Sequence, residues 1–127
     1  MLLRSQSQNT TYNLEVVTME EMNIKTLASG KYAMQRRSAL ESNSPEEIER
    51  MQEDGTLEEH LAYVQECVSN YVDICVDRYK QTEEYKQAEA ADPMEAMRLL
   101  NMTVLEAEEA AYRSWIAIDA YEEEDDE

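Results

Sequence analysis

The side chains that could take part in catalysis are one histidine, two cysteines and a large number of carboxylates. Ser/His/Asp or Cys/His catalysis would have to use His60, with Cys67 or Cys75 as the thiol nucleophile. Cys67 follows His60 by seven residues, which is about 10 Å along a helix axis and too far for direct pairing. We therefore expect His60 to be a half-exposed residue in the first turn of a helix.

Metal and cofactor sites need sequence patterns that this chain lacks. Helical bundles hold di-iron centres with Glu and Glu-x-x-His motifs, but Leu57 stands where such a motif would need Glu before His60. There is no Asp-x-Asp-x-Asp-Gly calcium loop, and two glycines cannot supply a dinucleotide-binding or phosphate-binding loop. No carboxylate pair lies in an apolar setting that would raise a pKa for acid–base chemistry. We expect a protein that is not an enzyme and has no cofactor or metal site.

The charge of the chain is strongly negative and unevenly distributed. The net charge is −18 over 127 residues. Residues 1–43 carry five Lys/Arg and four Asp/Glu, whereas the remainder carries six Lys/Arg and 25 Asp/Glu, a net −19. Such a surface repels DNA, RNA and anionic membranes, so we expect neither direct nucleic-acid binding nor membrane binding. The charge indicates a basic protein partner, and the alternative is that it provides only solubility.

Two groups of carboxylates are the candidates for binding such a partner. The first recurs at steps of seven, seven, four and seven residues along one face of a predicted helix: Glu59, Glu66, Asp73, Asp77 and Glu84. The second is a C-terminal run of six: Glu122, Glu123, Glu124, Asp125, Asp126 and Glu127. We call the first group the acidic stripe, for which an ordinary solvated helix face is the alternative interpretation.

Two apolar seams predict the helices that would position these groups. From Thr56 to about Tyr85, apolar residues recur at alternating four- and three-residue steps, as on one face of a helix: Leu57, Leu61, Val64, Val68, Tyr71 and Cys75. From Pro93 to about Tyr121 the second seam contains Met97, Leu100, Val104, Ala107, Ala111, Trp115 and Ile118. A helix about 40 Å long needs a partner of similar length. We predict an all-α small helical bundle, with two long antiparallel helices and shorter N-terminal helices.

Four short motifs mark expected helix starts, each with an oxygen-bearing cap residue and Glu three residues later. They are Thr18–Glu21, Ser44–Glu47, Thr56–Glu59 and Asp92–Glu95, and Pro45 and Pro93 occupy first helical positions. Gly30 is expected to break or kink the first helical run, and Gly55 to end a short helix. The boundaries predict a flexible N-terminal arm at residues 1–17, a helical domain at 18–121 and a disordered acidic tail at 122–127.

Three apolar residues of the long helix lie off its main seam: Tyr63, Cys67 and Ile74. They are expected to meet the N-terminal helices, and the alternative is a second protomer, so a homodimer stays open. Cys67 and Cys75 would lie about 12 Å apart along one helix, beyond the reach of a disulfide, which suits a reducing compartment. The sequence shows no signal-peptide core and no membrane-spanning run, so we expect a cytoplasmic protein.

A set of residues spread over positions 30–116 forms a recognisable pattern: Gly30-Lys31-Tyr32, Leu40, Pro45, Gly55, Leu57, His60-Leu61, Asp92, Met94, Asn101 and Ala107-Glu108-Glu109. In this pattern the sequence resembles the TnpV-like proteins, a family of small proteins carried on transposons and conjugative elements of Firmicutes. The pattern describes a fold and includes no catalytic motif, so it implies no catalytic residue. The chain departs from the family at Val104-Leu105-Glu106, where basic residues are usual, and in its acidic tail.

Three functions fit these observations. The first is an inhibitor of a nucleic-acid-binding enzyme, because mobile elements are attacked by RNA-guided nucleases whose channels are positively charged. A rigid acidic bundle could occupy such a channel in place of phosphates, as an anti-CRISPR protein would. The second is a TnpV-like accessory protein that binds a transposase or recombinase. The third is an acidic solubilising subunit of a complex.

Overall fold

The computed structural model describes residues 23–118, and this part of the chain consists of helices joined by short connections, without β-strands. Residues 23–28 are helical. The elements that follow are α2 (Lys31–Asn43), α3 (Pro45–Asp54), α4 (Leu57–Lys80), α5 (Glu83–Ala91), α6 (Pro93–Ala111) and the π-helix η1 (Tyr112–Ile116). The prediction of an all-α helical bundle is confirmed. The predicted arm at 1–17, the helix start at Thr18–Glu21 and the acidic tail at 122–127 lie outside the described residues.

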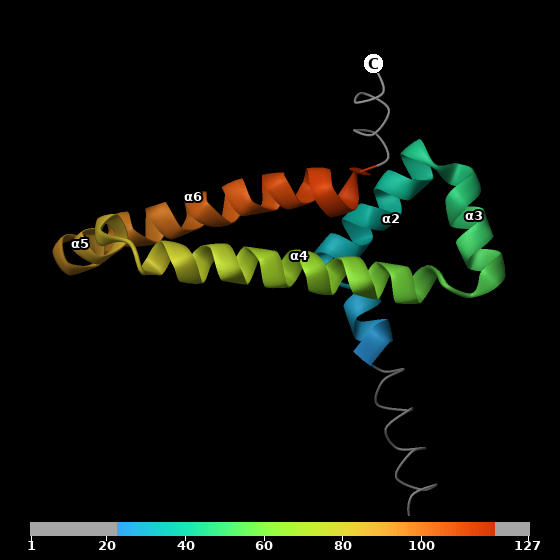
Figure 1. The fold of residues 1–127 in the computed structure, drawn as a ribbon, viewed down its shortest axis with the longest axis horizontal. Coiled ribbons are helices and arrows are strands. Elements are labelled where there is room, and N and C mark those ends of the chain that lie inside the picture. The colour runs from blue at the N-terminus through green and yellow to red at the C-terminus, as the bar shows by residue number, and fades with distance from the viewer. Residues whose placement is uncertain (1–22, 119–127) are drawn as a thin grey trace, which may run out of the picture.

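The two longest helices, α4 and α6, lie side by side, and α5 joins them at one end (Figure 1). The chain runs along α4 toward α5 and returns along α6. At the other end α2 crosses the pair, and α3 connects α2 to the start of α4. The most extensive packing between elements is that of α4 against α6, followed by that of α2 against α4. The acidic stripe therefore lies on α4, the helix that packs against both α6 and α2.

The core consists of two groups of buried side chains that meet along α4. One group joins α4 to α2, α6 and η1, and contains Ala39, Val64, Val68, Val72, Ala107, Ala111 and Ile116. The other joins α2 and α3 to the first turns of α4, and contains Ala33, Leu40, Ile48, Met51, Leu57 and Leu61. Because small alanines face α4 from α6, the two helices can approach closely there. The apolar seam predicted for α4 is buried as far as Val68, and Tyr71 and Cys75 are half-buried.

The predicted seam of the last helix is wrong at its first residue. Met97 is 58% exposed, whereas the preceding Ala96 is 3% exposed. The buried face continues from Ala96 through Leu100 to Ala107, which is helical spacing. Because alanine contributes little to a hydrophobic pattern, the sequence favours the larger Met97 over Ala96 as the buried residue.

The long helix predicted over Thr56–Tyr85 is in fact two helices, because α4 ends at Lys80 and α5 begins at Glu83. Thr82 makes the break: its hydroxyl donates to the Tyr79 carbonyl (2.7 Å) and accepts from the Tyr85 N–H (3.2 Å). This is an N-cap for α5. Tyr85 is then buried against the Tyr79 ring, with centroids 5.8 Å apart. No glycine, proline or capping-box Glu marks this break in the sequence, so helical periodicity alone missed it.

The last helix also differs from the prediction, because regular α-helix ends at Ala111 rather than near Tyr121. The Ala117 N–H donates to the Tyr112 carbonyl at 2.8 Å, five residues back, which closes a π-turn. The extra residue in the turn changes which side chains face the core. Ile116 becomes 1% exposed, and the ring of Trp115 lies 5.5 Å from that of Tyr71.

The helix starts predicted at Pro45, Leu57 and Pro93 are confirmed, but their capping boxes are not formed as expected. Only Asp92 accepts from N–H groups of the following first turn; the side chains of Ser44 and Thr56 do not. The N–H group of each cap residue already donates to a carbonyl of the preceding helix. Ser44 donates to the Leu40 carbonyl (2.8 Å), Thr56 to the Met51 carbonyl (2.9 Å) and Asp92 to the Ala88 carbonyl (2.7 Å). The Glu three residues later therefore has no N–H to accept from, because consecutive helices are joined by one or two residues.

Gly30 breaks the first helical run, which is one of its two predicted outcomes, and it is the N-cap of α2. A side chain from another helix completes this helix start. The Gln65 Oε1 of α4 accepts from the N–H groups of Tyr32 (2.8 Å) and Ala33 (3.0 Å). A Cβ at Gly30 would overlap the end of the Gln65 side chain, so a larger residue here would displace that side chain from its two hydrogen bonds. Gly55, by contrast, ends α3 with a left-handed φ of 74°.

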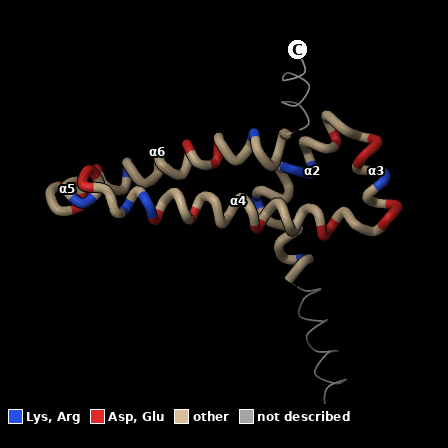
Figure 2. The backbone as a smooth tube through the Cα atoms, viewed as in Figure 1, with Lys and Arg blue, Asp and Glu red and all other residues tan. Residues whose placement is uncertain are grey.

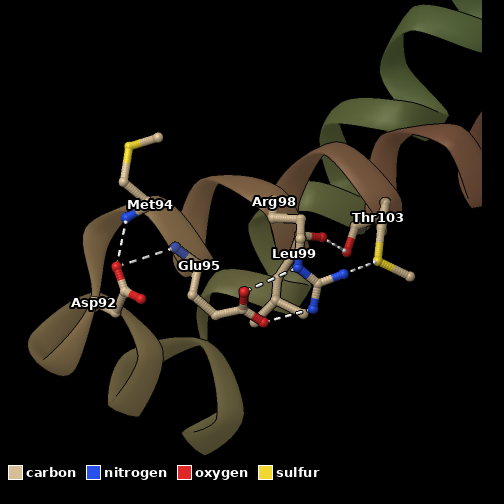
Figure 3. A network of polar contacts seen from close by, with 7 residues as sticks. Asp92, Met94, Glu95, Arg98, Leu99 and Thr103 are labelled. Carbon is tan, nitrogen blue, oxygen red and sulfur yellow. Dashed lines mark hydrogen bonds and ion pairs between the residues drawn. The ribbon is translucent and has the colours of Figure 1, made fainter.

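The cap of α6 gives a direct test of helix-start chemistry. Asp92 Oδ1 accepts from the N–H groups of Met94 (3.2 Å) and Glu95 (3.5 Å), and Glu95 instead holds Arg98 (Figure 3). We expect Asp92→Ala to lower the free energy of unfolding by about 1 kcal/mol. Glu95→Ala should cost less than Asp92→Ala, because it removes only an exposed ion pair that solvent screens. Urea unfolding measures both, and an equal cost at the two positions would contradict the assignment of the cap to Asp92.

Candidate protein-interaction surface

Four members of the acidic stripe lie on the outer face of α4, and all four are exposed: Glu59, Glu66, Asp73 and Asp77. At about 100° per residue they fall within about 40° of one another around the helix. The buried Val68 lies on the opposite side of α4, where the helix packs against α6. Figure 2 shows carboxylates at intervals along α4. The described stripe thus faces away from the core along most of the helix.

The fifth predicted member, Glu84, does not belong to this face. It lies on α5, beyond the break at Thr82, and is exposed. It lies close to the Tyr79 hydroxyl, and the pKa of Tyr79 is raised chiefly by burial and then by the Glu84 charge. The stripe therefore ends at Asp77. The other predicted partner-binding residues, Glu122–Glu127, lie outside the described residues.

Two large apolar side chains are exposed on the same side of α4 as the stripe. Tyr63 is 62% exposed and Ile74 is 51% exposed. The expectation that the N-terminal helices cover them is wrong for the part of the chain that the structure describes. Aromatic side chains are enriched in the buried cores of protein interfaces, whereas the rims are polar. The outer face of α4 thus combines two exposed apolar side chains with the exposed carboxylates of the stripe.

His60, the one candidate catalytic base, takes part in a structural junction. Its Nε2 accepts from the Arg36 Nε at 3.0 Å, so this nitrogen carries no proton in this arrangement. Arg36 is 6% exposed, and its Nη1 donates to the Ile116 carbonyl at 2.9 Å. One buried guanidinium thereby connects α2, α4 and η1. His60 is half-buried in the first turns of α4, as its position in the sequence predicts; the role of Arg36 was not recognised because its partners are distant in sequence.

A second polar junction fixes α2 to α6 through Glu108. Its Oε2 accepts from the Lys31 Nζ (2.9 Å) and from the Tyr32 hydroxyl (2.7 Å). The hydrogen bond from Tyr32 and then that from Lys31 lower the pKa of Glu108. Burial, followed by the bond to Glu108, raises the pKa of Tyr32 to about 12. The carboxylate is thus held in its charged form between two helices.

This junction makes part of the stability dependent on pH. Because the folded-state pKa of Glu108 is lowered, its contribution is present above the unfolded carboxyl pKa of about 4.3 and is lost as pH falls through the folded value. We expect Glu108→Gln to lower the free energy of unfolding by about 1 kcal/mol at pH 7. The difference in free energy of unfolding between this variant and the unaltered chain should become smaller below about pH 4. Glu109→Gln, at the exposed neighbouring position, is the control; a Glu108→Gln effect independent of pH would refute this account.

Residues 23–118 also bear on metal binding, membrane insertion and disulfide formation. In that range no group of three or more His, Cys, Asp or Glu side chains is arranged to hold a metal ion. Among the helices of this range, none combines the length and apolar character needed to cross a membrane. Cys67 and Cys75 are half-buried free thiols, so the expectation that they do not pair with each other is confirmed.

Comparison of the chain with protein-family models, with curated proteins and with solved structures gives no match. The resemblance to TnpV-like proteins stays a prediction. Several residues that carry it meet in the structure: Lys31 and Tyr32 bind Glu108, Gly30 admits Gln65, and Asp92 caps α6. In the structure these residues make contacts that begin helices or hold them together.

Proposed function

We propose that the protein is a non-enzymatic acidic interaction protein that inhibits a nucleic-acid-binding enzyme by occupying its basic channel. The intended target class is the RNA-guided nuclease, and the protein would act as an anti-CRISPR protein in the cytoplasm. The observation that carries the proposal is the exposed row of Glu59, Glu66, Asp73 and Asp77 on one face of α4.

The geometry of the row supports occupation of an elongated channel. Eighteen residues separate Glu59 from Asp77, so the charges extend over about 27 Å of helix. In this proposal α4 and α6 are two long antiparallel helices, and their packing against each other keeps the outer face of α4 straight. The channels of RNA-guided nucleases bind an extended heteroduplex through its backbone charges. A rigid linear array of carboxylates can compete for the same Lys and Arg side chains.

Two further observations favour a binding surface over simple solubility. The negative charge is concentrated after residue 43, where 25 Asp/Glu face six Lys/Arg. Tyr63 and Ile74 are also exposed beside the stripe, although solubility alone favours polar residues at such positions. Both apolar residues could bury area against a partner once charges have brought the proteins together.

The alternative function is that of a TnpV-like accessory protein that binds a transposase or recombinase. The resemblance over residues 30–116 favours this alternative. The residues that carry the resemblance include Lys31, Tyr32 and Glu108, which form the junction between α2 and α6. A DNA-binding recombinase also presents a basic surface, so the same stripe would serve. The two functions differ in the partner and in whether binding blocks an activity.

The test is cleavage of a plasmid by purified RNA-guided nucleases from Firmicutes, with and without the protein, at rising salt concentrations. We expect inhibition at low salt that weakens as salt rises, because exposed charges are screened over about 8 Å at physiological ionic strength. Added target or guide nucleic acid should compete with the protein. Full cleavage at low salt by several nucleases, with the protein in large excess, would refute the inhibitor proposal. Binding to a purified transposase in the same salt series would then support the alternative.

A further inference from the structure

The outer face of α6 carries a row of side chains at heptad spacing, of which Glu108 is hydrogen-bonded to Lys31 and Tyr32 of α2. Its members recur at steps of four, three, four, three and four residues: Met94, Arg98, Asn101, Leu105, Glu108 and Tyr112. Met94 is 74% exposed, Leu105 is 65% exposed and Tyr112 is 41% exposed. Side chains at alternating three- and four-residue steps lie on one side of a helix, where a second helix can pack along them. The face therefore offers three exposed apolar side chains and three polar ones to such a helix.

The pattern is symmetric about position 103. Met94 and Tyr112 are equally far from this position, as are Arg98 and Glu108, and Asn101 and Leu105. We propose that α6 pairs with α6 of a second copy of this chain, antiparallel, about a two-fold axis at the level of Thr103. Each apolar end residue of one copy then meets an apolar end residue of the other, as an isologous interface requires.

Charge complementarity selects the second copy and its direction. Antiparallel pairing places Arg98 of one copy at the level of Glu108 of the other, beside the exposed Glu109. Parallel pairing would instead place like charges at the same level, which is unfavourable. Glu108 accepts from Lys31 and Tyr32 through Oε2, and Arg98 is paired with Glu95 within α6. In the dimer the remaining Oε1 of Glu108 accepts from Arg98 of the second copy, which replaces or shares this exposed intrahelical pair. Two such ion pairs would form across the axis.

The arrangement also limits repulsion between two chains of net charge −18 each. The acidic stripe lies on the side of α4 opposite Val68, the residue that packs against α6. Pairing through the outer face of α6 therefore places the two stripes on opposite sides of the dimer. The remaining repulsion is screened by salt, so we expect the dimer to strengthen as salt rises, opposite to the salt dependence of binding to a basic channel.

The first test is sedimentation equilibrium of the full chain over a range of concentrations and salt. We expect a monomer–dimer equilibrium in which Leu105→Glu raises the dissociation constant by about tenfold or more, because each substitution enters the interface twice. Ile74→Glu alters an exposed apolar residue of α4 and should leave the equilibrium unchanged. A monomer at every concentration, or equal effects of the two substitutions, would overturn the proposal.

The second test concerns direction. An oxidised mixture of Met94→Cys and Tyr112→Cys chains should yield a cross-linked pair containing one chain of each, whereas Met94→Cys chains alone should not cross-link beyond the background of the unaltered chain. Arg98→Glu should weaken the dimer, and adding Glu109→Arg should recover part of the loss. Cross-linking of Met94→Cys chains with one another would show parallel pairing and refute the two-fold arrangement. These outcomes do not depend on nuclease inhibition, which is proposed to involve the acidic stripe on α4.

Discussion

The Val68→Asp variant is expected to have no cooperatively folded state. Val68 is 0% exposed at the contact of α4 with α6, where Ala111 is also 0% exposed. A carboxylate there would be buried without a partner, at a cost of several kcal/mol. The whole stability of a domain of this size is about 5–15 kcal/mol, and the lost apolar packing adds to the cost. Ala111→Asp should have the same effect from the opposite helix.

The measurements are far-ultraviolet circular dichroism and urea unfolding of both variants. Cys67→Ser is the matched control, since it is the neighbouring residue on α4 and is only half-buried. We expect the control to remain helical and to unfold cooperatively, with a loss of about 1 kcal/mol or less. If both aspartate variants stayed helical and cooperative, the α4–α6 contact would not be the centre of the core.

Reversing the charge of the acidic stripe is expected to abolish inhibition of the target enzyme. The substitutions are Glu59→Lys, Glu66→Lys and Asp77→Lys, which change the net charge from −18 by six units. Asp73 is left unaltered because its charge also acts on the Tyr32 hydroxyl next to Glu108. Each substitution replaces attraction to a basic channel with repulsion, so we expect at least about a hundredfold weaker inhibition.

The control has the same net charge and places the substitutions on α3: Glu46→Lys, Glu49→Lys and Glu53→Lys. All three residues are exposed, and each set contains one carboxylate from a first helical turn, Glu59 of α4 and Glu46 of α3. The plasmid-cleavage assay at fixed salt compares the two variants, and urea unfolding verifies that both are folded. Equal loss of inhibition in both would show that total charge matters, and would remove the specific role proposed for the stripe.

The sequence alone determined the features that depend on neighbouring residues. Proline at the first helical position predicted the starts of α3 and α6 correctly, because its fixed φ and missing N–H suit that position and no other in a helix. Gly55 predicted the end of α3, because it adopts a left-handed conformation that other residues avoid. The exposed face of α4 also followed from helical periodicity, since carboxylates seven residues apart must lie on one side.

Tertiary structure decided the features that depend on residues distant in the chain. Tyr85 is buried against Tyr79 only because the chain turns at Thr82, and this turn removed Glu84 from the stripe. Arg36 is buried because its partners, His60 and the Ile116 carbonyl, come from two other elements. Hydrogen bonds between elements have no periodicity along the chain, so the sequence pattern could not locate them. The charges of this protein were therefore visible in its sequence, whereas only the fold showed which of them share a face and which hold the helices together.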